Sequence, residues 1–156
     1  MDFLKTADGR LYVKKLIAAA PDASPDEIFK RAYSQIASGS TIPKIAIIDS
    51  PLVKIVPMGQ EVTKYSPFFT TMEELQAIAQ GKKTLADAFG LPLISEAPKY
   101  SIFEIKPINP TEVFISTVAP TAEFGGSIGR AGGAAQYLIP DRNEWLPSKL
   151  IGTIDN

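Results

Sequence analysis

The order of the predicted elements along the chain constrains the fold more than any other feature. Helical patterns fill residues 1–42, and the remainder carries short strand-like runs with two small helices among them. Strands and helices do not alternate regularly, as they do in a parallel sheet built from strand–helix–strand units. The pattern therefore predicts an α+β fold with N-terminal helices and a mainly antiparallel sheet.

Serine and threonine caps mark three of the predicted helix starts. Ser24 is followed by proline and then by glutamate three residues on, which is a capping-box pattern. Thr71 opens a second capping box, and Thr84 starts a shorter turn. After Ser24, five apolar residues fall on one predicted helical face: Ile28, Phe29, Ala32, Tyr33 and Ile36. The glycines predicted to end the three helices are Gly39, Gly81 and Gly90.

The strand-like runs are short and are separated by prolines. They cover residues 44–49, 52–56, 100–106, 113–118 and 134–139. Proline lacks a backbone donor, so it confines strands to the segments between prolines. With 156 residues the chain is long enough for one domain. We expect residues 1–42 to form a helical part that packs as one compact unit with the functional domain, residues 43–156.

The composition excludes several kinds of chemistry. The chain has no cysteine and no histidine, which removes thiolate nucleophiles, the serine–histidine pair and the usual metal ligands. The net charge of −1 argues against a purely electrostatic grip on nucleic acid. No apolar run approaches the roughly 18–20 residues that span a bilayer. We therefore expect no metal site, no nucleic-acid partner and no membrane span.

The segment 125–133 (GGSIGRAGG) holds five glycines in nine positions. Backbone N–H groups of such a loop can approach phosphates closely. The segment lacks the lysine and hydroxyl residue of a P-loop, and it leads into a strand rather than a helix. A flexible hairpin loop explains the glycines equally well, so both interpretations stay open.

Polar residues interrupt the apolar faces of three predicted strands. Gln136 shares a face with Ala134 and Leu138, and Ser116 lies between Phe114 and Val118 on another inward face. Lys54 lies between two apolar residues of the earlier strand. A buried polar group needs partners, so each of these residues either binds a ligand or bonds to a nearby loop. In the segment 65–71, Phe68 and Phe69 lie between residues with hydroxyl side chains. The two rings either stack on a flat heterocyclic ligand or pack in the hydrophobic core.

These segments occur in an order that resembles a known family. They are residues 53–59 (VKIVPMG), 65–70 (YSPFFT), 114–120 (FISTVAP) and 132–137 (GGAAQY). The set is similar to the NAD-cleaving toxin domains of polymorphic bacterial toxins, which include NAD⁺ glycohydrolase effectors of type VI secretion and the tuberculosis necrotizing toxin group. The wider parent is the ADP-ribosyltransferase fold. It implies a split antiparallel β-sandwich around an NAD cleft.

The resemblance also implies roles for particular residues. Gln136, Lys54 and Glu123 are the implied catalytic residues, with Gln136 on the ribose hydroxyls. Phe68 and Phe69 would form the wall of the nicotinamide pocket, and a basic residue would face the pyrophosphate. The implied substrate-binding residues are Lys64, Tyr65, Ser66, Phe68, Phe69, Thr70, Ser116, Thr117, Arg130 and Tyr137. Family members usually have arginine where this chain has Lys54, and lysine offers no bidentate fork to a pyrophosphate.

The implied function is hydrolysis of the nicotinamide–ribose bond of NAD⁺ or NADP⁺, with the dinucleotide as substrate and no cofactor. Nicotinamide is a good leaving group because its ring nitrogen is cationic, so a site without histidine can support the reaction. The resemblance further implies delivery by a bacterial secretion system into a target-cell cytoplasm, and a cognate immunity protein that occludes the cleft. Two alternatives stay open: an ADP-ribosyltransferase toxin that modifies a macromolecule, and a non-enzymatic protein-binding domain.

Overall fold

The computed structural model describes residues 2–63 and 65–156. The α-helices are α1 (Ala7–Ala19), α2 (Pro25–Ala37), α3 (Met72–Ala79) and α4 (Leu85–Ala88), and short 3₁₀ turns are η1 (Phe3–Lys5), η2 (Leu93–Ser95), η3 (Phe124–Gly126) and η4 (Arg142–Glu144). The strands are β1 (Lys44–Ile48), β2 (Leu52–Pro57), β3 (Phe68–Phe69), β4 (Lys99–Ile105), β5 (Thr111–Thr117), β6 (Thr121–Glu123), β7 (Ile128–Arg130), β8 (Ala135–Leu138) and β9 (Lys149–Asp155). Within these ranges, no helix is long and apolar enough to cross a lipid bilayer.

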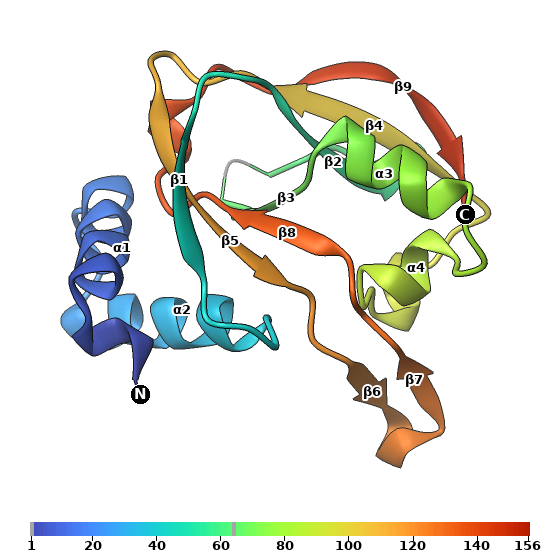
Figure 1. Ribbon diagram of the computed structural model, residues 1–156, viewed down its shortest axis with the longest axis horizontal. Coiled ribbons are helices and arrows are strands. Elements are labelled where there is room, and N and C mark those ends of the chain that lie inside the picture. The colour runs from blue at the N-terminus through green and yellow to red at the C-terminus, as the bar shows by residue number, and fades with distance from the viewer. Residues whose placement is uncertain (1, 64) are drawn as a thin grey trace.

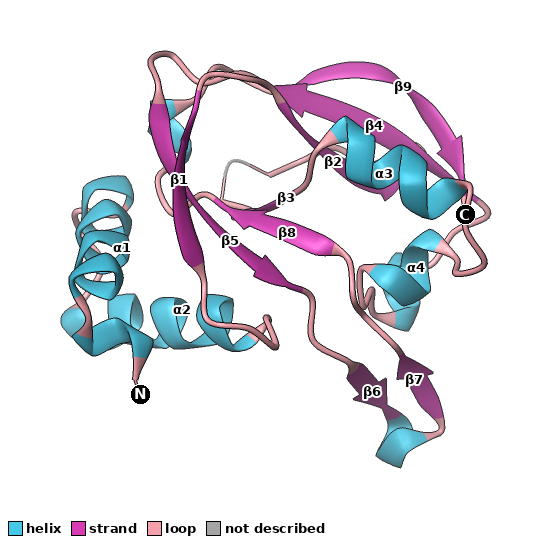
Figure 2. Ribbon diagram, viewed as in Figure 1, coloured by secondary structure: helices cyan, strands magenta, loops and turns pink. Residues whose placement is uncertain are grey.

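The strands form two larger sheets and a hairpin (Figure 2). One sheet has the order β1-β5-β8-β3, the other has the order β2-β4-β9, and β6 pairs with β7. Every pairing between these strands is antiparallel. The predicted α+β class with antiparallel sheets is therefore confirmed.

Three caps predicted from the sequence are formed. The side chain of Ser24 accepts a hydrogen bond from the Glu27 N–H at the start of α2. Thr71 accepts one from Glu74 at the start of α3, and Thr84 caps α4 in the same way. Each cap satisfies one of the backbone donors that a helix start leaves without a partner.

The N-terminal helices cover one face of the four-stranded sheet (Figure 1). Tyr12 of α1 is fully buried, and its ring meets the Phe114 ring of β5 edge-to-face, with centroids 4.8 Å apart. The Tyr12 hydroxyl donates a hydrogen bond to Gln35 of α2. Ile28 of α2 and Leu138 of β8 belong to the same buried cluster. Aromatic burial and edge-to-face packing therefore hold both helices on the sheet.

A second cluster joins the two larger sheets, and a third holds the later helices. Leu52 and Ile105 of one sheet pack with Val113 and Phe69 of the other. In the third cluster, α3 and α4 bury Leu75 and Leu85 against the β2-β4-β9 sheet, around Val53, Tyr100 and Ile102. The early helices, the two larger sheets and the later helices therefore pack on one another through these three clusters.

One predicted helical face is wrong in part. Ile28 and Ala32 are buried, and Ile36 packs against the same cluster. Phe29 and Tyr33, however, are more than half exposed. The buried stripe of α2 follows the spacing i, i+4, i+8, and the two aromatic residues lie one position beyond it. Four strands of the structure, β3, β6, β7 and β9, are not among the strands predicted from the sequence, and the first three of them span only two or three residues.

The buried Lys15 connects α1 to strand β5 and to the η4 turn. The Lys15 Nζ lies 2.7 Å and 2.8 Å from the two carboxylate oxygens of Glu144, and 3.2 Å from Glu112 Oε2. Burial alone would lower the pKa of Lys15, but the hydrogen bonds and charges of Glu144 and Glu112 outweigh it and raise the pKa. The pKa of Glu112 is lowered by its own backbone N–H and by Lys15.

We expect Lys15→Met to destabilise the domain by about 1–3 kcal/mol at pH 7, because two neighbouring carboxylates then lose their cation. The pKa of Glu112 is lowered in the fold, so its contribution is present at neutral pH and is lost as the pH falls below its ordinary value of 4.5. The pKa of Lys15 is raised in the fold, so the stability that its ammonium contributes is lost only when the pH rises above its ordinary pKa of 10.5. Urea unfolding at pH 7 and pH 4 tests this, with the exposed Lys14→Met as control. Equal stability of the two variants at pH 7 would contradict the prediction.

Candidate functional site

A pocket of about 320 Å³ opens where the end of α2, the β2–β3 region and the loop after α4 meet. One wall is the backbone and side chains of residues 89–92, and residues 118–121 continue it after β5. The lining residues are Ala37, Ser38, Val53, Lys54, Ile55, Phe68, Phe69, Thr70, Phe89, Gly90, Leu91, Pro92, Val118, Ala119, Pro120, Thr121 and Gln136. Such a lining, mostly apolar with a few polar groups, is typical of a small-molecule site.

A row of polar side chains crosses the four-stranded sheet beside this pocket. Ser116 of β5 stands opposite Gln136 of β8, and all of Thr70, Ser116 and Gln136 are buried. The Gln136 Nε2 donates to Ser116 Oγ at 2.9 Å and to Ser38 Oγ at 3.0 Å. Thr70 Oγ1 donates to the Ala135 carbonyl at 2.9 Å. The inward face predicted for Gln136 and Ser116 is therefore confirmed.

The amide of Gln136 has used both of its donors within the protein. Among the described residues, no group donates a hydrogen bond to its Oε1. Because Gln136 also lines the pocket, this oxygen is the acceptor that the amide can offer to a ligand. The contact with Ser38 adds to the backbone hydrogen bonds from the Ser40 N–H to the Thr117 carbonyl and from the Ala119 N–H to the Ser38 carbonyl, which hold the end of α2 beside the sheet.

Gly39 lets the chain after α2 pass close to this row. A Cβ atom built on Gly39 would lie 2.6 Å from Ser116 Oγ and 3.2 Å from Gln136 Nε2. A side chain at this position would therefore collide with Ser116 and with the Gln136 amide and disturb the hydrogen bond between them. The glycine that was predicted from the sequence only as a helix end is thus also a spacer for the polar row.

Lys54 supplies the charge of the pocket. Among the described lining residues it alone is charged, and none carries a carboxylate. Its Nζ donates to the Phe68 carbonyl at 3.0 Å and lies 5.9 Å and 5.7 Å from the ring centroids of Phe68 and Phe69. Burial lowers the pKa of Lys54 to about 8. The cation of this site is thus the ammonium group of Lys54, which lies against two aromatic rings and releases its proton more readily than an exposed lysine does.

Five of the residues predicted from the sequence line this pocket, namely Lys54, Phe68, Phe69, Thr70 and Gln136. Ser116 lies behind Gln136 as its hydrogen-bond partner. Thr117 and Tyr137 alternate to the opposite face of the sheet, where Tyr137 packs in the cluster between the sheets. Tyr65 is exposed, and neither it nor Ser66 is among the lining residues. Lys64 lies outside the described residues.

Glu123 and Arg130 lie on the β6–β7 hairpin and not in the pocket lining. The Glu123 carboxylate accepts a hydrogen bond from the Leu93 N–H at 2.8 Å. Arg130 donates from Nε to the Leu91 carbonyl at 3.1 Å and forms an ion pair with Glu96 at 3.1 Å. Both side chains therefore engage the loop after α4 rather than a ligand.

No local pattern in the sequence indicates that residues 89–92 form a wall of this pocket. The sequence pattern predicts only a helix end at Gly90. Ser38 likewise follows a helix without any motif of its own. These residues reach the pocket through long-range packing, which local patterns do not encode.

No protein-family model matches the sequence, and no curated protein matches it. Solved structures that align with the chain include the following two. The structure of Tse6 in complex with Tsi6 has 13% identity and a TM-score of 0.47, over 94% of this chain and 98% of that chain. The structure of Rhs1-CT in complex with its cognate immunity protein RhsI1 has 16% identity and a TM-score of 0.48, over 73% of this chain and 85% of that chain.

Proposed function

We propose that this domain is an NAD⁺ glycohydrolase toxin, which hydrolyses the nicotinamide–ribose bond of NAD⁺ or NADP⁺ to nicotinamide and ADP-ribose. The observation that carries the proposal is the meeting of four distant segments in one pocket. Residues 53–59, 65–70, 114–120 and 132–137, on which the family resemblance rests, all contribute lining residues. We propose with it that the two larger antiparallel sheets correspond to the split β-sandwich of the ADP-ribosyltransferase fold.

The charge of Lys54 determines how a dinucleotide would lie in the pocket. A protonated ammonium attracts the pyrophosphate and repels the cationic pyridinium ring. Its Nζ already contacts both the Phe68 and Phe69 rings. We therefore assign the pyrophosphate to this end, and we revise the expectation that these two rings form the nicotinamide wall. Phe89 is the remaining aromatic residue of the described lining, and we assign it to the nicotinamide.

The bond that breaks joins the ribose carbon to a ring nitrogen that is already cationic. Departure of neutral nicotinamide needs no proton, and it leaves an oxocarbenium-like sugar. The Oε1 of Gln136 is an acceptor that binds a ribose hydroxyl or the attacking water, and its dipole stabilises the developing positive charge. The attacking water then loses a proton to solvent as ADP-ribose forms.

The absence of a carboxylate from the described lining favours hydrolysis over transfer to a macromolecule. Transferases of the resembling family usually carry glutamate where this chain has Gln136. A glutamate at that position can activate an acceptor nucleophile, whereas an amide can orient only what binds to it. Free water is then the acceptor.

We further propose that the domain is delivered into a target-cell cytoplasm by a secretion system and that a cognate immunity protein occludes the pocket. A cell that makes an NAD-destroying domain would otherwise lose its own NAD⁺. Expression of this chain alone in a bacterial cytosol should lower NAD⁺ and stop growth. Unchanged NAD⁺ and unchanged growth at a verified expression level would contradict the toxin proposal.

The direct test is incubation of the purified chain with NAD⁺ and, separately, with NADP⁺. We expect equal amounts of free nicotinamide and ADP-ribose to form without any macromolecular acceptor. Phe29→Ala, which changes an exposed residue of α2, serves as the control that should retain full activity. Nicotinamide release only when an acceptor is added would indicate a transferase, and no release under either condition would exclude both enzymes.

A further inference from the structure

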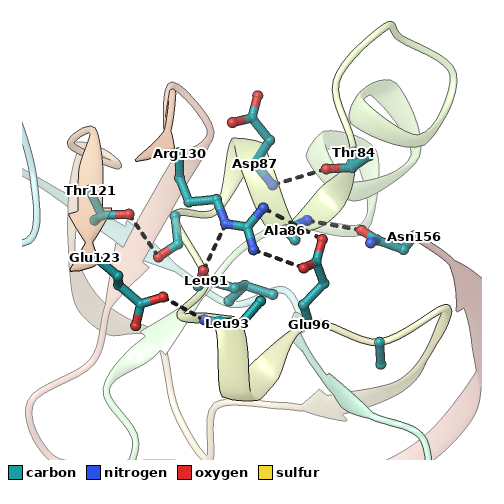
Figure 3. A network of polar contacts seen from close by, with 12 residues as sticks. Thr84, Ala86, Asp87, Leu91, Leu93, Glu96, Thr121, Glu123, Arg130 and Asn156 are labelled. Carbon is teal, nitrogen blue, oxygen red and sulfur yellow. Dashed lines mark hydrogen bonds and ion pairs between the residues drawn. The ribbon is translucent and has the colours of Figure 1, made fainter. Parts of the chain in front are cut away.

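The β6–β7 hairpin is tied to the segment that follows α4 by a network of polar contacts (Figure 3). Figure 3 shows Arg130 reaching from β7 to the Leu91 carbonyl and to the carboxylate of Glu96, while Glu123 of β6 reaches the Leu93 N–H. A longer contact of 3.4 Å joins Thr121 Oγ1 to the Gly90 carbonyl. These contacts come from both strands of the hairpin, so the hairpin holds the segment at several points between residues 90 and 96.

The segment held in this way is also a wall of the pocket. Residues 89–92 line it, yet their own backbone donors bond only locally: Phe89 N–H to Leu85 and Leu91 N–H to Ala86. The carbonyls of Gly90 and Leu91 face the hairpin instead. Among the contacts of the described residues, the hairpin therefore supplies the side-chain hydrogen bonds that fix this wall from behind.

Arg130 is the centre of the contact. Its side chain is only 12% exposed, and the Nη2 lies 3.1 Å from Glu96 Oε2 while Nε donates to Leu91. The planar guanidinium thus binds a carboxylate on one edge and a backbone carbonyl on another, which the point charge of a lysine does not reproduce. The Arg130 side of this ion pair is buried, whereas the Glu96 side chain is 37% exposed.

The base of the hairpin is anchored separately, at Asp87 of α4. The Asp87 carboxylate accepts from the Ala131 N–H at 2.7 Å, and the Gly132 N–H donates to the Asp87 carbonyl at 3.0 Å. Gly132 has a positive φ of 68°, and a Cβ atom there would lie 2.5 Å from the Val118 carbonyl. Loss of the Arg130 contact would therefore release the Leu91 carbonyl and loosen the wall, while the base of the hairpin stays attached and Glu123 still accepts from the Leu93 N–H.

We infer that Arg130, together with Glu96, is a positioning residue that sets the place of the 89–92 wall and so controls the affinity of the pocket for its ligand. Arg130 acts through the wall, without contact to the reacting atoms. The kinetic part of this inference rests on the proposed NAD⁺ glycohydrolase function, whereas the mobility of the wall is measurable without any substrate.

The test compares Arg130→Met and Glu96→Gln with Lys99→Met, which breaks the exposed ion pair between Lys99 and Asp155. Amide hydrogen exchange of residues 89–93 is measured on the free proteins. We expect exchange to accelerate by about tenfold in the first two variants, because the wall opens locally, and to stay unchanged in the third. Arg130→Lys should behave as Arg130→Met does, since lysine cannot bind both acceptors at once.

Kinetics on the same preparations provide the second readout. We expect KM for NAD⁺ to rise about 3–10-fold while kcat stays within about twofold. This is the result expected when the bound substrate and the transition state lose the same binding energy. Unchanged exchange in Glu96→Gln and Arg130→Met would overturn the inference, as would a fall in kcat at constant KM. If Arg130→Met does not fold, Glu96→Gln decides alone. If the wild-type chain releases no nicotinamide, the proposed function fails, and the exchange measurement still decides the role of Arg130.

Discussion

Gln136→Ala is expected to reduce the kcat for NAD⁺ hydrolysis by about 10²–10³-fold while the domain stays folded, because one preorganised polar contact is lost where charge develops. The amide is placed for this role: its donors are held by Ser38 and Ser116, so its Oε1 is directed by two fixed hydrogen bonds. An oriented acceptor in a mostly apolar pocket stabilises a sugar cation more than a mobile one does.

The same hydrogen bonds give Gln136 a structural role, and the two roles predict different measurements. A purely structural amide would cost about 1–3 kcal/mol of stability on replacement and leave the activity of folded molecules intact. Melting temperature and turnover are therefore measured on one preparation, with the exposed Gln76→Ala of α3 as the matched control. A variant that melts early but keeps its specific activity would refute the catalytic role.

Lys54→Met is expected to weaken the binding of ADP-ribose at pH 7 by about tenfold or more, since one close charge pair with the pyrophosphate is lost. The same change should raise the free energy of unfolding by about 1 kcal/mol, because a cation without a carboxylate partner leaves an apolar pocket. Calorimetric titration and thermal unfolding give the two values. Lys44→Met, at an exposed position of β1, should change neither.

The pH dependence of this effect has a definite sign. The pKa of Lys54 is lowered to about 8, so the wild-type protein should lose its advantage in ADP-ribose affinity as the pH rises through 8. The folded chain also binds this proton less tightly than the unfolded chain does, so protonation opposes folding most strongly below pH 8, and this opposition fades as the pH rises from 8 to the ordinary pKa of 10.5. Lys54→Met should therefore exceed the wild type in stability at pH 7 by more than it does at pH 9. An affinity ratio that stays constant from pH 6 to pH 9 would contradict the assignment of Lys54 to the anion.

Local sequence patterns were sufficient to predict those features that depend on residues close together in the chain, namely helix caps and the alternation of side chains along a strand. Ser24, Thr71 and Thr84 cap their helices as predicted, since a cap is decided by residues three positions apart. Strand alternation placed Gln136 and Ser116 on buried faces because successive side chains of a strand point to opposite sides. The order of early helices and late strands predicted the α+β class in the same way.

Tertiary structure alone decided which segments meet. Phe29 and Tyr33 fit the predicted helical face by spacing, yet they lie one position beyond the stripe of α2 that packs on the sheet, and they stay exposed. Arg130 and Glu123 lie close in sequence to the glycine-rich segment, but the hairpin turns them toward residues 91–96 and away from the pocket. The partners of these charges lie about 30 positions or more away along the chain, and the energy of such contacts depends on distances that only the packed chain fixes. The sequence by itself therefore determined the elements and their buried faces, and long-range packing determined the wall of the pocket and the residues that hold it.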